Sequence, residues 1–382
     1  MKKTFITALA LIGAVASVHA DGYKGSTPKS GETYSLYNVG KKQFLGTEGD
    51  RLVLGGEKVE VTLDGITDTN TPGFFRITSA GKVLGAQLWG TPSIGGGKFS
   101  DWRIEPVAGK SNVYTISSRN TEASASFYIY QNSVYDRIAA MPVKPNTDFE
   151  SAQWLLVATA DVDTPVYTFS EDDSQYERHD DGKAEVHVAR KFNLNQWNAF
   201  CSPVDISAEQ VASQFGAEAR VAEFTGFSGE DAKFTSVASV KAGTPYIVYV
   251  TNQPSAGYYT ISGDLLFAAE AASVYHDGIT FQGTFTNGSV DGSPYVMDKN
   301  SVLTRSASGV VGMSGYLKSP ATTVIRTWSL DGVVTGVVSV GVSSDSRFDI
   351  YNTGGQKVKT GASDTKNLDH GVYIVKGKKI SK

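Results

Sequence analysis

The sequence has little cysteine, little charge and no long hydrophobic run beyond its first residues. A single cysteine, Cys201, stands among apolar neighbours in "WNAFCSPVDI", so no intrachain disulfide can form and we expect a buried thiol. Charged residues make up 19% of the chain and the formal net charge is -4, which argues against nucleic acid as a partner. No later run is long enough for a transmembrane helix, so the fold must rely on buried area rather than on covalent crosslinks.

Motifs that carry chemistry are also missing. The histidines show no zinc-ligand spacing, and there is no G-x-S-x-G elbow, P-loop or dinucleotide-binding fingerprint. The acidic stretch "EDDSQYERHDDG" (171–182) lacks the spacing of a calcium loop, so we expect a solvated loop there. We therefore predict no catalytic residue, no metal and no cofactor. Carboxylates that meet only in space leave no such motif, so a secreted, glycosidase-like hydrolase is an alternative.

The first residues read "MKKTFITALALIGAVASVHA" and have the pattern of a secretory signal peptide. Lys2 and Lys3 form a positive start, an apolar stretch too short to span a bilayer follows, and Ala20 ends a small-residue cleavage site. We predict that residues 1–20 are removed and that the mature chain is secreted or lies on the outer cell surface.

Glycine, tyrosine and phenylalanine are abundant, with 40, 18 and 18 residues. Aromatic and β-branched residues favour strands and glycine permits tight turns, so the composition predicts an all-β protein. One short helix is expected in "SAEQVASQFG", where Ser207 and Gln210 fit a capping box, Val211 and Phe215 share a face, and Gly216 ends the helix.

Three stretches in the first half resemble one another. They begin at Tyr34, Phe75 and Tyr114, about 40 residues apart, and each has an alternating strand, a short turn and a second alternating strand. Over residues 31–160 this pattern resembles the ricin-type β-trefoil family. The sequence departs from that family in its unevenly spaced aromatic residues (Phe75, Trp102 and Trp154) and in having Gln153 directly before Trp154 instead of a Gln-x-Trp signature. A small β-barrel or an irregular sandwich is the alternative fold.

The resemblance implies that a glycan or another extended ligand binds in shallow pockets between hairpins. A sugar stacks its C–H face on an aromatic ring, while amides and carboxylates hold its hydroxyls. Trp89, in the glycine-rich loop "QLWGTPSIGGG", is one candidate, and "FYIYQNSVYD" supplies the others. The predicted ligand-binding residues are Trp89, Tyr130, Gln131, Asn132, Tyr135 and Asp136. The alternative is that these rings only pack beneath the hairpins.

Residues 164–330 contain short strands with turns at regular intervals, which predicts an antiparallel β-sandwich. The stretch from "FNLNQWNAFCSPVDI" to "AGTPYIVYV" resembles a module of secreted and surface proteins of gut and oral anaerobes. The matching positions are Trp197, Asn198, Cys201, Pro203, Gly243, Pro245 and Tyr246. This resemblance implies export and surface architecture but no reaction.

The last segment, residues 333–382, contains "RFDIYNTGGQKVKTG" and "GVYIVKGKK". These two strands resemble the C-terminal sorting domain of the type IX secretion system, which implies recognition by secretion machinery. The matching residues are Ile350, Tyr351, Asn352, Gly355, Gln356, Val358, Leu368, Gly371, Tyr373 and Val375. The full family domain is a longer sandwich, so either 333–342 supplies the missing strand or the tail is a degenerate version that no longer directs export. The other alternative is that the tail is a closing hairpin of the preceding sandwich.

The sequence thus predicts an exported, non-catalytic β protein with a glycan or host polymer as its partner. It would bind through the N-terminal module. The alternatives are the secreted hydrolase and a purely structural surface or adhesive component.

Overall fold

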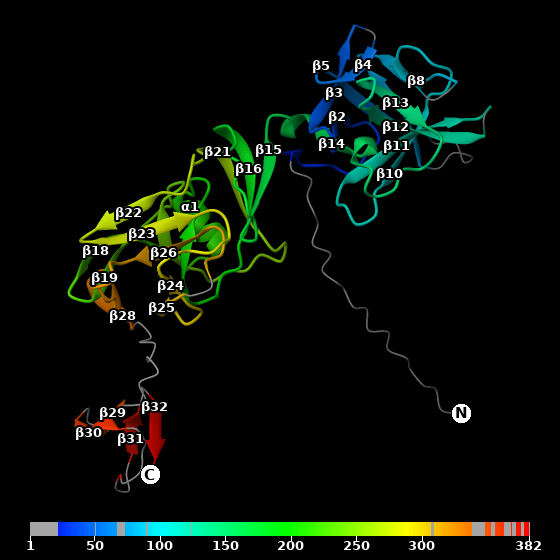
Figure 1. The fold of residues 1–382 in the computed structure, drawn as a ribbon. Helices are drawn as coiled ribbons and strands as arrows, with labels where there is room; N and C mark the ends of the chain where they lie inside the picture. The colour runs from blue at the N-terminus through cyan, green and yellow to red at the C-terminus, as the bar shows by residue number, and fades with distance from the viewer. Residues whose placement is uncertain are drawn as a thin grey trace, which may run out of the picture.

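The structure is a computed structural model, and the residues that it describes are almost entirely β (Figure 1). They run from 22 to 381, apart from gaps at 50, 67–72, 89–90, 123, 307–308, 338–347, 353–355, 363–367, 369–371 and 376–377. The predicted signal peptide (1–20), the candidate ligand residue Trp89 and the tail glycines Gly355 and Gly371 lie outside the described residues.

Six strands of the first half close an antiparallel barrel. Each strand pairs with the next, and the last pairs back to the first. In order around the barrel they are β2 (Thr33–Asn38), β6 (Glu60–Gly65), β7 (Phe74–Ser79), β10 (Asp101–Pro106), β11 (Val113–Asn120) and β14 (Trp154–Ala158). Closure leaves the barrel without unpaired edges, which is one way for a small all-β unit to avoid aggregation.

Three hairpins extend from this barrel, one from each repeated stretch (Figure 1). They are β3 (Gln43–Glu48) with β4 (Arg51–Leu54), β8 (Lys82–Ala86) with β9 (Pro92–Ile94), and β12 (Ala125–Asn132) with β13 (Arg137–Met141); β5 (Glu57–Lys58) also pairs with β3. Four strands recur three times, beginning at β2, β7 and β11. The predicted threefold repeat is therefore confirmed, and we call β2 to β14 the trefoil-like unit.

The uneven spacing of the aromatic residues has a structural explanation. Trp102 and Trp154 both lie on the fourth strand of their repeats, fully buried in the barrel core, and each indole donates to a carbonyl of its own hairpin. Trp102 Nε1 lies 2.7 Å from the oxygen of Leu84, and Trp154 Nε1 lies 3.3 Å from that of Ile129. Phe75 lies on a first strand and has no part in this pattern.

The second unit consists of three sheets. The first contains β1 (Gly22–Tyr23), β15 (Pro165–Ser170), β16 (Gly182–Ala189) and β21 (Tyr259–Leu265). The central sheet contains β17 (Trp197–Cys201), β20 (Pro245–Tyr249), β18 (Arg220–Ser228), β19 (Asp231–Val237), β27 (Thr327–Leu330) and β28 (Val333–Val337). The third contains β22 (Ser273–His276), β23 (Ile279–Thr284), β26 (Ser314–Lys318), β24 (Tyr295–Met297) and β25 (Leu303–Arg305).

The central sheet is covered on both faces. Along β17, Phe200 packs into the core shared with the first sheet, whereas Trp197 and Ala199 pack into the core shared with the third. Along β20, Val248 belongs to the first core and Ile247 to the second. Burial on both faces explains why "WNAFC" and "PYIVY" are continuous apolar runs rather than alternating ones. The predicted sandwich is present, with one more sheet against it.

Most pairs in the second unit are antiparallel, as predicted, but two are not. β15 runs parallel to β16, and β19 runs parallel to β27. Parallel neighbours need a connection that crosses over and returns to the same end of the sheet, here the acidic segment after Ser170 and the long path between Val237 and Thr327. Regular turn spacing carries no information on such pairs, so the sequence expectation missed them.

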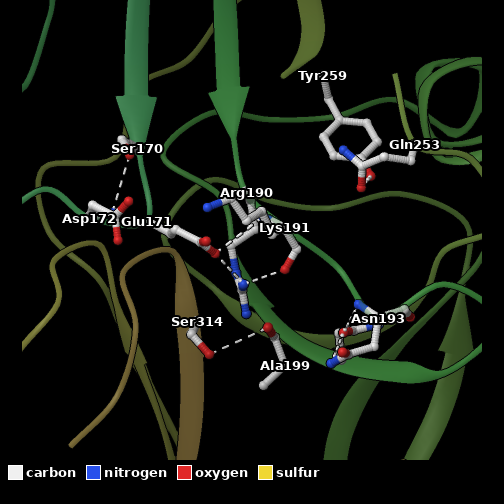
Figure 2. Close-up of polar contacts among 11 residues, drawn as sticks. Ser170, Glu171, Asp172, Arg190, Lys191, Asn193, Ala199, Gln253, Tyr259 and Ser314 are labelled. Carbon is white, nitrogen blue, oxygen red and sulfur yellow. Dashed lines mark hydrogen bonds and ion pairs between the residues drawn. The ribbon is translucent and has the colours of Figure 1, made fainter. Parts of the chain in front are cut away.

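A buried ion pair stands where β15 and β16 end (Figure 2). Because Ser170 pairs with Ala189, the next residues, Glu171 and Arg190, leave the sheet side by side. Arg190 Nη1 donates to Glu171 Oε2 at 2.5 Å, and the same carboxylate oxygen accepts the Lys191 N–H at 3.2 Å. Burial lowers the pKa of Arg190, and the neighbouring Glu171 carboxylate partly offsets that effect.

The predicted helix is present as α1 (Ala208–Gln210), which continues into a π-helical turn (Val211–Phe215). The Ser207 side chain accepts from the Gln210 N–H, the Gln210 side chain accepts from the Ser207 N–H, and Gly216 leaves the helix at φ 113°. Two short 3₁₀ turns, Glu150–Ala152 and Thr159–Asp161, flank β14. No described helix is long and apolar enough to cross a membrane.

The tail forms a separate four-stranded sheet in the order β30 (Lys357–Ala362), β29 (Phe348–Asn352), β31 (Val372–Val375) and β32 (Lys378–Ser381). Its small core contains Ile350 and Val375, with Leu368 and Tyr373 against them, whereas Val358 is 46% exposed. Lys378 and Lys379 belong to β32, a strand that the sequence did not predict. β28 pairs with β27 and so does not supply a strand to the tail.

Candidate functional site

The third hairpin carries five of the predicted ligand-binding residues, and most of their polar atoms hold the turn itself. Asn132 Oδ1 accepts the N–H groups of Val134 and Tyr135 at 3.0 and 3.3 Å, and its Nδ2 donates to the Tyr130 hydroxyl at 3.1 Å. Such side-chain bonds to nearby backbone are typical of asparagine in turns. The Asn132 amide therefore shapes the hairpin, and its direct contact with a sugar stays a prediction.

Gln131 and Asp136 form a second internal contact. Gln131 is 2% exposed, and its Nε2 donates to Asp136 Oδ1 at 2.8 Å. Asp136 has φ 44°, a conformation that aspartate tolerates better than most residues, and its carbonyl accepts from Arg51 of the first hairpin at 3.4 Å. The buried Gln131 supports the turn through Asp136, and its direct contact with a ligand stays a prediction.

Tyr135 is the aromatic residue of this group that faces solvent. It is 64% exposed, and the Arg137 guanidinium lies 5.0 Å from the ring centroid. An exposed ring fixed by a turn and a cation offers a stacking surface at low entropic cost. Tyr130 is half-buried beside Phe149, with their ring centroids 5.8 Å apart.

The third hairpin also differs from the other two at an equivalent position. Gly46 and Gly85 follow Leu45 and Leu84, and a Cβ at either glycine would collide with a backbone carbonyl, that of Gly55 or of Gly96. The third repeat has Tyr130 at the corresponding place after Ile129. The threefold repeat is therefore broken at the hairpin that presents Tyr135.

A shallow pocket lies between the first and second hairpins. Its volume is about 560 Å³, within the range of ligand sites. Thr47, Glu57 and Glu60 line it from the first repeat, and Ser79 and Lys82 line it from the second. The wall is rich in carboxylate, hydroxyl and ammonium groups, which suit a ligand with many hydroxyls.

Two further pockets lie where β15 and β16 meet the trefoil-like unit, and sequence reasoning missed both. One, of about 470 Å³, includes Tyr23, Tyr167 and Glu177. The other, of about 350 Å³, includes Glu185 and His187, whose Nε2 lies 2.8 Å from Glu185 Oε1. The sequence alone could not indicate these two pockets, because the residues that line each of them come from segments far apart in the chain. The acidic stretch 171–182, interpreted as a solvated loop, supplies part of the first wall.

The structure also shows the surroundings of the single cysteine and of the possible metal ligands. Cys201 is fully buried, its Sγ lies 3.1 Å from the Gly243 carbonyl, and burial raises the pKa of its thiol. Within the described ranges, no group of three or more His, Cys, Asp or Glu side chains could hold a metal ion.

No protein family model matches the chain, and no curated protein matches it. Among proteins of known structure, one likeness is to SeviL bound to asialo-GM1 saccharide, with 14% identity and a TM-score of 0.27, covering 34% of this chain and 99% of SeviL. Another is to a GlcNAcα1-4Gal-releasing endo-β-galactosidase from Clostridium perfringens, with 17% identity and a TM-score of 0.26, covering 33% of this chain and 32% of the enzyme. At these values neither likeness defines what this chain binds.

Proposed function

We propose that this is an exported, non-catalytic protein that binds a glycan or another extracellular polymer through its trefoil-like unit. The observation that carries the proposal is the polar pocket between the first two hairpins, with the exposed Tyr135 on the third. Carboxylates and lysines on a rigid barrel can hold sugar hydroxyls, and an exposed ring can stack on a sugar face. The affinity of one such site is expected to be modest, because a shallow pocket buries little of its ligand.

Export is proposed from the pattern of residues 1–20, and a sorting role for the tail from the residues that resemble a sorting domain. Six of these lie on strands of the four-stranded sheet: Ile350, Tyr351 and Asn352 on β29, Val358 on β30, and Tyr373 and Val375 on β31. Cell fractionation tests export, and finding the mature chain in the cytoplasm would contradict it.

The binding proposal is tested on a glycan array with the mature chain. We expect a specific signal that Tyr135→Ala or Glu60→Gln reduces at least about fivefold, a conservative figure for losing one sugar contact. Trp89→Ala tests a second predicted residue in the same assay. Glu218→Gln is the matched control, because Glu218 is exposed, belongs to the second unit and undergoes the same change of charge. No signal from the parent protein would favour the purely structural role.

The hydrolase alternative has one feature in its favour, the Glu185–His187 pair beside the 350 Å³ pocket. His187 also stacks on Tyr258, with centroids 3.9 Å apart, and is 3% exposed, so packing explains its position without catalysis. A glycosidase and peptidase substrate screen decides between the two classes. Turnover that His187→Gln or Glu185→Gln abolishes would replace the binding proposal with an enzymatic one.

A further inference from the structure

The 470 Å³ pocket has walls from both units, and we call it the inter-unit cleft. β1 pairs with β15, and β15 alternates its side chains so that Tyr167 lines this cleft while Val166 lines the smaller pocket. Tyr37 and Lys42 come from the trefoil-like unit, and Glu177 comes from the acidic stretch after β15. The cleft therefore exists only when the two units are together.

The aromatic walls of the cleft are held in place by other rings. The Tyr23 ring lies 5.0 Å from Tyr37 and 4.5 Å from Phe44, measured between centroids. On the opposite wall, Tyr167 stacks on His179 at 3.7 Å with an interplanar angle of 10°. A tyrosine hydroxyl is protonated at neutral pH and can donate, and burial raises the pKa of both Tyr23 and Tyr167 further. Rings fixed in this way lose little freedom when a ligand arrives.

Polar side chains complete the cleft. Asp173 is fixed because its Oδ2 accepts the Ser170 N–H at 2.7 Å, and Gln175 and Glu177 follow it along the same wall. Lys42 stands on the side of the trefoil-like unit. The charged groups that line the cleft are thus two carboxylates and one ammonium, an excess of negative charge. Such a site offers both acceptors and donors to hydroxyl groups and disfavours anionic ligands.

We propose that the inter-unit cleft is a saccharide site built jointly by the two units, and that it selects neutral over acidic glycans. The proposal rests on the glycan-binding function above and adds a place and a ligand class. Rings at the walls stack on the sugar, while Glu177, Gln175 and Lys42 bind its hydroxyls. Binding there also ties the two units together, because the ligand contacts both.

The test uses the mature chain, an array of neutral, sialylated and sulfated oligosaccharides, and calorimetric titration of the neutral glycan with the strongest signal. Glu177→Gln and Lys42→Gln alter opposite walls, and both residues are exposed, so the fold should persist. Each should weaken binding at least about tenfold, as expected for losing a hydrogen bond to a charged group. Glu177→Gln should also narrow the preference for neutral over acidic glycans. Glu218→Gln is the control, and thermal unfolding checks the fold of each variant.

The outcomes separate the two proposals. If Glu177→Gln and Lys42→Gln weaken saccharide binding, the cleft proposal is supported, whether or not Tyr135→Ala and Glu60→Gln also reduce the signal. If the parent binds and only Tyr135→Ala or Glu60→Gln matters, the cleft proposal is wrong while the proposed function stands. If the Glu218→Gln control weakens binding as much as the cleft variants, the effect is one of net charge and the cleft proposal is again wrong. Absence of any saccharide signal from the parent overturns both.

Discussion

The ion pair between Glu171 and Arg190 should stabilise the second unit only as a pair. The side chains of Glu171 and Arg190 are 10% and 11% exposed, so removing either partner leaves a buried charge without compensation. We expect Glu171→Leu and Arg190→Met each to lower the free energy of unfolding by about 3 to 5 kcal/mol. Glu171→Leu also removes the acceptor of the Lys191 N–H, a loss of about 1 kcal/mol that is included in this range.

The double variant distinguishes this reasoning from simple loss of contacts. With both charges gone, apolar side chains fill the space, and the cost should fall to about 1 to 2 kcal/mol, set by the Lys191 groups that lose partners. The coupling free energy between the two sites should therefore be at least about 4 kcal/mol. Urea unfolding of the mature chain, with hydrogen exchange followed on peptides from β15 and β16, assigns the change to the second unit.

A solvent-exposed pair provides the control. Arg326 Nε lies 2.6 Å from Glu230 Oε2, but the side chains are 53% and 51% exposed, so Glu230→Leu should cost no more than about 1 kcal/mol. The reasoning is refuted if the single variants at Glu171 and Arg190 cost as little as this control. It is equally refuted if the double variant costs the sum of the two singles.

Two further predictions concern buried titratable groups. Burial raises the pKa of Tyr259 from 10.0 to about 12, so its contribution to stability is full below pH 10 and is lost as pH rises toward 12, where the unfolded chain ionises first. Tyr259→Phe, which also removes a hydrogen bond to the Asn252 carbonyl, should make stability fall less steeply across that window in alkaline unfolding; an unchanged slope would contradict it. Cys201 should react with a thiol reagent only at the rate of unfolding, because its thiol is buried and its pKa is raised. Rapid labelling of the native protein would show that the site opens locally.

Features set by neighbouring residues could be predicted from the sequence. The threefold repeat was visible because most of its strands pair with one close to them in the chain, so that turns and alternation recur with the same period. The helix was visible because Ser207 and Gln210 satisfy each other's backbone N–H groups within one turn. The buried state of Cys201 followed from its apolar neighbours.

Features that depend on distant segments could not be predicted. β1 and β15 pair with each other although the whole trefoil-like unit separates them in the chain, and no local sequence pattern predicts this pairing. The inter-unit cleft was missed for the same reason, since Tyr37 and Tyr167 gain their roles only from that pairing. β32 was not predicted because a lysine-rich segment suggests a solvated tail rather than a strand. Lysine is nevertheless common on exposed edge strands, and β32 is the edge strand next to β31. At the third hairpin, the residue types indicated groups that could bind a sugar. Only the contacts in the structure show which of these side chains hold the turn.

Because β1 pairs with β15, the chain leaves the neighbouring sheet after β1, forms the barrel, and returns to the same place in that sheet at β15. In architectural terms the barrel is an insertion in a hairpin, attached by two chain crossings instead of one flexible hinge. Two connections restrict rotation of the barrel relative to the sheet much more than one would. This helps to hold the residues that both units contribute to a shared surface in fixed relative positions. They also imply that the barrel can be excised: a short turn that joins Tyr23 directly to Pro165 would leave the host sheet with its hydrogen bonds intact.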